Sequence, residues 1–194
     1  MTKITVAAMA LFLVNFLFAQ KVNVAWGDEF KLKRGSTDLA VICADKTGIY
    51  VKESHYALKS YFVIGATLRE YASLIKLDKN LTELYKNDFN KELKGKEYEQ
   101  FFFIKNKLYL LATDYSKRDK TLTLFGAEID KNTGDLNGEW QEITRWQKEE
   151  KSEDISFKAS CNADSSKIVL ISTILGKEKN NYQLQEFDIS LKAT

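Results

Sequence analysis

Three stretches of the chain repeat one pattern, in which a short strand, a polar turn and a second short strand follow one another. The stretches are residues 39–53 (LAVICADKTGIYVKE), 99–113 (EQFFFIKNKLYLLAT) and 155–173 (ISFKASCNADSSKIVLIST). Apolar and β-branched runs on both sides of a cluster of Asn, Asp or Ser are typical of β-hairpins. The first apolar residues after the turns are Ile49, Leu108 and Ile168, so the hairpin recurs about every 60 residues.

A further strand pair follows each hairpin after a polar spacer. Its first strand ends each time in an apolar residue followed by Asp, at Asp78, Asp130 and Asp188. The unit therefore has four strands in about 50 to 60 residues, and it is present twice in full and once in part. Four-stranded antiparallel units repeated at this length are typical of β-propeller blades.

The sequence thus predicts an all-β protein, a β-propeller-type array of four-stranded antiparallel blades. About two and a half blades are present in a domain of residues 20–194. Propellers have at least about four blades, so this number does not close a ring. The expected blade units are residues 39–88, 99–145 and 155–194. We expect the chain to be part of a larger ring. A β-sandwich is the alternative; it explains an end at Thr194 without missing sequence, but it does not explain the repeat.

The N-terminus has the layout of a secretory signal peptide. Lys3 precedes a mainly apolar run from Ile4 to Phe18, and small Ala19 follows that run. Residues 1–19 are therefore expected to be a cleaved signal peptide. We then expect the protein to be exported to the periplasm or the cell exterior, with association with the outer membrane as one alternative. No membrane span is expected after cleavage.

The segment CNADSSKIVLIS resembles the turn of TolB-type propeller repeats, where a Pro-Asp-Gly turn precedes an apolar strand. Ala163, Asp164 and Ser165 occupy the turn here, and Asp45 takes the same role in ADKTGIYV. Neither turn contains Pro, and the second unit, KNKLYLL, has no Asp. The resemblance implies a propeller and identifies Asp45 and Asp164 as turn residues rather than catalytic candidates.

The two cysteines, Cys43 and Cys161, lie near the ends of equivalent strands two units apart. That separation exceeds the reach of a disulfide, so we expect two free, largely buried thiols. A disulfide between them would favour the sandwich. His55 is the single histidine, and we expect it on the surface or at an interface.

Residues 130–139 (DKNTGDLNGE) are the best candidate for a metal site. The loop offers the oxygen ligands that Ca²⁺ prefers, from Asp130, Asn132, Asp135, Asn137 and Glu139. It departs from the EF-hand template, and Asn and Gly are also ordinary hairpin residues. We therefore expect a plain hairpin loop, with calcium as the minor alternative and no other cofactor.

Three consecutive aromatics, Phe101, Phe102 and Phe103, must alternate between the two faces of a strand. This pattern predicts a strand packed between two blades. Elsewhere Lys and Arg are interleaved with Asp and Glu at a net charge of +2, which excludes the basic stripe of a nucleic-acid-binding protein.

These features favour an exported, non-catalytic propeller that serves as a binding or scaffold module in the bacterial cell envelope or outside the cell. Its partner would be a protein or a glycan bound through blade loops, and the oligomeric state is left open. No catalytic residue is nominated, because the chain has no G-x-S-x-G elbow and one histidine. The alternative is the propeller portion of a secreted hydrolase that acts on glycans or peptides.

Overall fold

The computed structural model describes residues 24, 26, 27, 29, 31–61, 65–149, 153–176 and 180–194. Every regular secondary-structure element within these residues is a β-strand. The described residues contain no helix of the length and hydropathy needed to cross a membrane. The predicted signal peptide lies outside the described residues.

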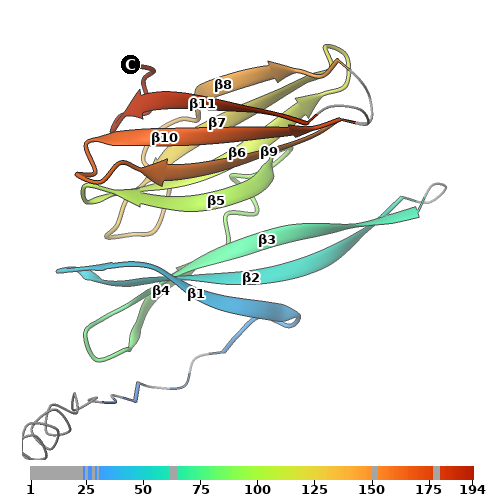
Figure 1. Cartoon of the computed structure of the whole chain (residues 1–194). Coiled ribbons are helices and arrows are strands. Elements are labelled where there is room, and N and C mark those ends of the chain that lie inside the picture. Colours follow the sequence, from blue (N-terminus) through green and yellow to red (C-terminus); the bar gives the residue numbers. More distant parts are fainter. Residues whose placement is uncertain are drawn as a thin grey trace, which may run out of the picture.

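The strands form three antiparallel sheets, which we call blades 1, 2 and 3 in chain order (Figure 1). Neighbours in each sheet are also neighbours in sequence. Blade 1 consists of β1 (Ser36–Asp45), β2 (Gly48–Tyr61), β3 (Gly65–Leu77) and β4 (Glu83–Asn87). Blade 2 consists of β5 (Glu97–Ile104), β6 (Lys107–Ser116), β7 (Thr121–Ile129) and β8 (Gln141–Gln147). Blade 3 consists of β9 (Asp154–Cys161), β10 (Lys167–Leu175) and β11 (Asn180–Asp188).

Blade 3 has the beginning of a fourth strand. An isolated antiparallel bridge joins Phe187 to Ala193. In blade 1 the corresponding pair is Leu77 with Glu83, the first pair of β4. The described part of blade 3 therefore follows the path of a four-stranded blade up to the point where the fourth strand starts.

The turn after the third strand explains why Asp recurs at that position. The Asp78 Oδ1 atom accepts hydrogen bonds from the backbone N–H groups of Asn80 (2.8 Å) and Thr82 (2.9 Å). The Asp188 Oδ1 atom accepts from Ser190 (2.7 Å) and Lys192 (3.0 Å) in the same way. Such a side chain replaces missing backbone partners and fixes a tight turn.

Both of these turns also place a leucine in the left-handed region, at Leu81 (φ 65°) and Leu191 (φ 63°). In blade 2 the turn is longer, and Gly134 (φ +82°) takes the left-handed position after Asp130. The repeat seen in the sequence is therefore a repeat of backbone geometry.

Blade 2 is the middle layer, and β5 contributes to the core on both of its faces. Phe101 (7% exposed) packs with Tyr50, Leu74 and other residues between blades 1 and 2. Phe102 (6% exposed) packs with Phe157 and other residues between blades 2 and 3. The prediction of a strand packed between two blades is confirmed.

The predicted fold class is confirmed by this arrangement, and the alternative β-sandwich is wrong. A sandwich has two sheets that share one core. The described residues form three sheets, with separate cores between blades 1 and 2 and between blades 2 and 3.

Gly134 provides a test of the contact between blades 1 and 2. A Cβ atom at this position would lie 2.5 Å from the Tyr85 ring, whereas at Gly138 (φ +97°) nothing lies within 4 Å. Both positions have positive φ, so alanine at either pays the backbone cost of about 1 kcal/mol. We expect Gly134→Ala to lose about 1–2 kcal/mol more unfolding free energy than Gly138→Ala.

Urea unfolding of the two variants, followed by circular dichroism, gives this difference directly. Equal losses in the two variants would show that the loop of blade 2 is not packed on Tyr85.

Candidate functional site

A pocket of about 480 Å³ lies where the first strands of the three blades approach one another. We call it the inner-strand pocket. Blades 1, 2 and 3 all contribute to its lining, through β1, β2, β5 and β9. The lining residues are Ala40, Ile42, Lys52, residues 98–103 and residues 158–161.

Glu99 is the acidic residue of this lining, and a β-bulge positions it. The register of β5 on β6 shifts between Tyr98, which pairs with Ala112, and Gln100, which pairs with Leu111. The extra residue in β5 is Glu99. Bulges redirect one side chain out of the normal alternation and are frequent beside active sites.

The Glu99 carboxyl is partly buried and has one polar partner from its own blade. The hydroxyl of Thr113, which is 3% exposed, donates a hydrogen bond of 2.8 Å to Glu99 Oε1. Burial raises the pKa of Glu99 to about 7, the carboxylates of Glu97, Glu70 and Asp154 add to the rise, and the Thr113 hydrogen bond opposes it. A large fraction of Glu99 is therefore protonated at neutral pH.

The side walls of the pocket are held by contacts between strands. Gln100 bridges blades 2 and 3, because its amide donates to the carbonyl of Ala159 (3.1 Å) and accepts from the Ala159 N–H (3.2 Å). On the side of blade 1, Lys52 Nζ lies 3.7 Å from a carboxylate oxygen of Glu70. The pocket thus combines one carboxyl of raised pKa with a lysine–glutamate pair and aromatic side chains.

Both cysteines are free, as predicted. The expected burial is wrong for Cys161, which is exposed and lines the pocket at the end of β9. It is exposed because the strand ends there and the polar turn of blade 3 begins. Cys43 is partly buried, and burial beside the Asp45 carboxylate raises its pKa to about 12, so it stays a thiol.

The two predicted turn aspartates have turn roles. Asp45 Oδ1 accepts hydrogen bonds from the Thr47 N–H (2.7 Å) and hydroxyl (2.6 Å). Asp164 Oδ1 accepts from the Ser166 N–H (3.0 Å) and hydroxyl (2.7 Å).

His55 lies on β2, partly buried, with its ring stacked on Tyr71 at 5.5 Å. Burial, together with the Lys33 ammonium, lowers the pKa of His55, so it is neutral at neutral pH. It does not line the inner-strand pocket.

The candidate calcium loop begins as a tight turn of blade 2. Asp130 Oδ1 accepts the Asn132 N–H (2.7 Å), and Asp135 Oδ1 lies 3.5 Å from the Asn87 amide of blade 1. The side chains of Asn137 and Glu139 are exposed. Among the described residues, no group of three or more His, Cys, Asp or Glu side chains is placed to hold a metal ion. Calcium binding stays a prediction.

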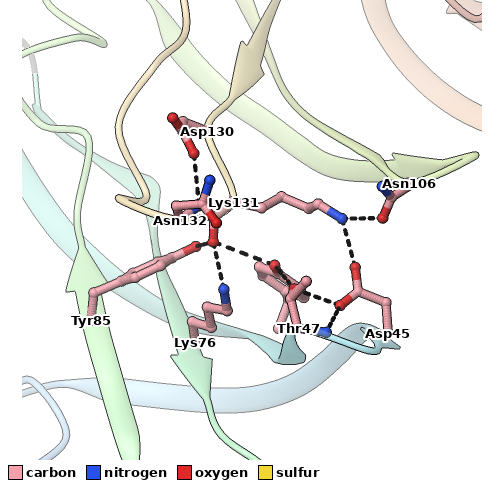
Figure 2. Close-up of polar contacts among 9 residues, drawn as sticks. Asp45, Thr47, Lys76, Tyr85, Asn106, Asp130, Lys131 and Asn132 are labelled. Atoms are coloured by element: carbon pink, nitrogen blue, oxygen red, sulfur yellow. Dashed lines mark hydrogen bonds and ion pairs between the residues drawn. The ribbon is translucent and has the colours of Figure 1, made fainter.

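Lys131 of the same loop joins blade 2 to blade 1, as Figure 2 shows. Its ammonium forms an ion pair with Asp45 at 2.7 Å and donates a hydrogen bond to the Asn106 side chain. Its backbone carbonyl accepts hydrogen bonds from Lys76 Nζ (2.7 Å) and, at longer range, from Tyr85 (3.4 Å). We call these contacts the interblade latch.

Sequence reasoning missed both Glu99 and the latch. Glu99 sits inside the repeated hairpin, where a polar residue is expected to face solvent, and nothing in the sequence marks a bulge. Lys131 is one of many lysines, and its partner Asp45 is 86 residues away.

The fold of this chain is similar to that of a solved structure. No family model and no curated protein matches the chain. The solved structure is an endo-arabinase from Bacteroides thetaiotaomicron, with a TM-score of 0.50 and 12% sequence identity. The match covers 81% of this chain and 58% of that one, so the chain spans little more than half of the enzyme's length. At this identity the likeness shows the fold alone, a β-propeller.

The buried position of Glu99 predicts a pH-dependent stability. Because its folded-state pKa is raised, the folded state binds the proton more tightly, and stability falls as pH rises from about 4.5 to about 7. Gln has the shape of the protonated carboxyl and still accepts the Thr113 hydrogen bond. We expect Glu99→Gln to be about 1–3 kcal/mol more stable than the natural chain at about pH 8 and equal to it at about pH 4.

Chemical unfolding at both pH values measures this difference. A Gln variant that gains the same stability at both, or none at either, would contradict a raised pKa at Glu99.

The interblade latch predicts the opposite dependence on pH. Burial would raise the pKa of Asp45, but hydrogen bonds from Lys131 and Thr47 outweigh it and lower the pKa to about 2. The pair therefore stabilises the fold above the ordinary Asp range, and this contribution is lost as pH falls toward about 2. We expect Lys131→Met to lose about 1–3 kcal/mol at about pH 7, a loss that shrinks on acidification.

Lys46→Met, at the exposed neighbour of Asp45, is the matched control and should change stability little. A loss in Lys131→Met that stays constant down to about pH 2 would rule out the ion pair as its cause.

Proposed function

We propose that this chain is the propeller portion of an exported hydrolase that acts on glycans, with the inner-strand pocket as its substrate site. The observation that carries the proposal is Glu99, a carboxyl placed by a bulge in the lining of a pocket, where burial raises its pKa to about 7. Glycoside hydrolysis needs such a group, because the departing sugar oxygen must receive a proton. We include export in the proposal because residues 1–19 have the sequence pattern of a signal peptide.

The roles of the pocket residues follow from this chemistry. Glu99 gives its proton to the glycosidic oxygen. Glycoside hydrolysis also needs a second, ionised carboxylate, as a base for water or as a nucleophile. Glu70 is our candidate for this role, because its ion pair with the pocket residue Lys52 ties it to the site. Thr113 is a positioning residue, since its hydroxyl orients the Glu99 carboxyl.

The rest of the lining suits a sugar. Tyr98 lines the pocket and lies against Phe101 with ring centroids 5.3 Å apart. Aromatic side chains offer the apolar faces of a sugar ring a packing surface, while amides and hydroxyls bind its hydroxyl groups. The fold likeness to an endo-arabinase supports the same class of substrate.

A non-catalytic binding module is the second candidate. The aromatic pocket at the meeting point of three blades supports binding whether or not Glu99 transfers a proton. On this alternative the protein holds a glycan through the same pocket and releases no product.

The two candidates separate in one experiment on the full chain. The chain is incubated with arabinan, xylan and galactan, and both retention on each polysaccharide and release of reducing ends are measured. We expect release that declines above about pH 7, and a loss of about 100-fold or more in Glu99→Gln without loss of retention.

Glu83→Gln, at an exposed carboxylate on β4, is the matched control and should behave as the natural chain. Release that survives in Glu99→Gln would contradict the proposed role of Glu99. Retention without any release would support the binding module.

A further inference from the structure

A second groove, of about 280 Å³, lies between the outer parts of blades 2 and 3. It is formed by the end of β8, by Glu149 and Glu153 after that strand, and by residues of β9, β10 and β11. We call it the outer groove. It shares no lining residue with the inner-strand pocket. Its lining residues are Trp146, Gln147, Glu149, Glu153, Ile155, Ile174, Asn181, Tyr182 and Gln183.

One wall of the outer groove is apolar. Trp146 is partly buried and packs against the core between blades 2 and 3, as does Ile174. The Trp146 side chain and Ile174 therefore give the outer groove an apolar wall.

The opposite rim is polar and partly preorganised. Glu153 is fixed because its Oε2 atom accepts the Glu149 N–H (2.8 Å). Gln147 is fixed because its amide donates to the carbonyl of Asp119 (2.8 Å). Asn181 and Gln183 are exposed, and the regular alternation of β11 places them on the same strand face as Phe187, which is buried toward blade 2.

We propose that the outer groove is a second glycan site, which binds one or two sugar rings of a neutral oligosaccharide. A tryptophan with aliphatic neighbours offers the apolar face of a sugar a surface, and amides and carboxylates bind its hydroxyls as donors and acceptors. A cation site is disfavoured, because no group of three or more acidic, His or Cys side chains among the described residues is placed for one. The ligand class rests on the proposed function, but the two sites have no lining residue in common.

Such a groove would hold one part of a polysaccharide while another part of the same polysaccharide occupies the inner-strand pocket. It would therefore raise the local concentration of substrate without taking part in the reaction.

The test uses arabinotriose, xylotriose and cellotriose with the full chain, and it follows tryptophan fluorescence and the heat of binding. We expect at least one of the three to bind with a Kd at or below about 1 mM. The fluorescence change should disappear in Trp146→Phe, which leaves Trp26 and Trp140 in place. The double variant Asn181→Ala/Gln183→Ala should weaken binding by about tenfold or more, and since both side chains are exposed it should still fold.

Glu186→Ala, further along the same strand, is the matched control and should bind as the natural chain. An unchanged affinity in the double variant, or no binding of any of the three sugars below about 10 mM, would overturn the proposal. Glu99→Gln distinguishes the two sites: it should leave the outer groove unaffected even where release of product is lost.

Discussion

The fold depends on one constraint, that blade 2 is covered on both faces. A β-strand alternates its side chains between two faces, so a middle layer needs apolar residues at successive positions. The run Phe101, Phe102 in β5 meets this need, with one ring in the core toward blade 1 and the next in the core toward blade 3. Blade 1 also buries Val51, Ile75 and Leu77 in a separate small cluster. Blade 3 needs only one apolar face, toward blade 2. In β9, for example, buried Ile155, Phe157 and Ala159 alternate with exposed residues.

Polar contacts set how the blades sit once this packing is made. Each third strand ends in an Asp-centred turn, and the longer turn of blade 2 reaches across to blade 1 through Lys131. Gln100 performs a similar task between blades 2 and 3 with its paired hydrogen bonds to Ala159. These contacts hold β1, β5 and β9 close to one another, and the inner-strand pocket lies at that place.

The features that follow from local rules could be predicted from the sequence, and those that need three-dimensional context could not. Strand periodicity, polar turns and the recurring Asp are local, so they predict blades, turn aspartates and the two-faced strand β5. Glu99 was not predictable because a bulge is an irregularity of pairing, which leaves no mark on the residue itself. The exposure of Cys161 depends on where β9 ends. The latch depends on a lysine and an aspartate from different blades, and the sequence offers many such pairs.

The candidate site is less predictable than the fold because its residues come from several strands. A propeller places its ligands at loops and inner strands that vary between proteins of the same architecture. In the function that we propose, the proton donor is one carboxyl, Glu99, whose proton affinity is changed by burial. Its surroundings come from β3, β5, β6 and β9, so no one segment of sequence contains them.

The most direct test of this account is the protonation of Glu99 itself. A ¹³C NMR titration of the side-chain carboxyl, assigned by the signal lost in Glu99→Gln, measures its pKa in the folded full chain. The structure predicts a midpoint of about 7. A midpoint at the ordinary value of about 4.3 for a glutamate would contradict the account, because Glu99 would then have no proton to give at neutral pH.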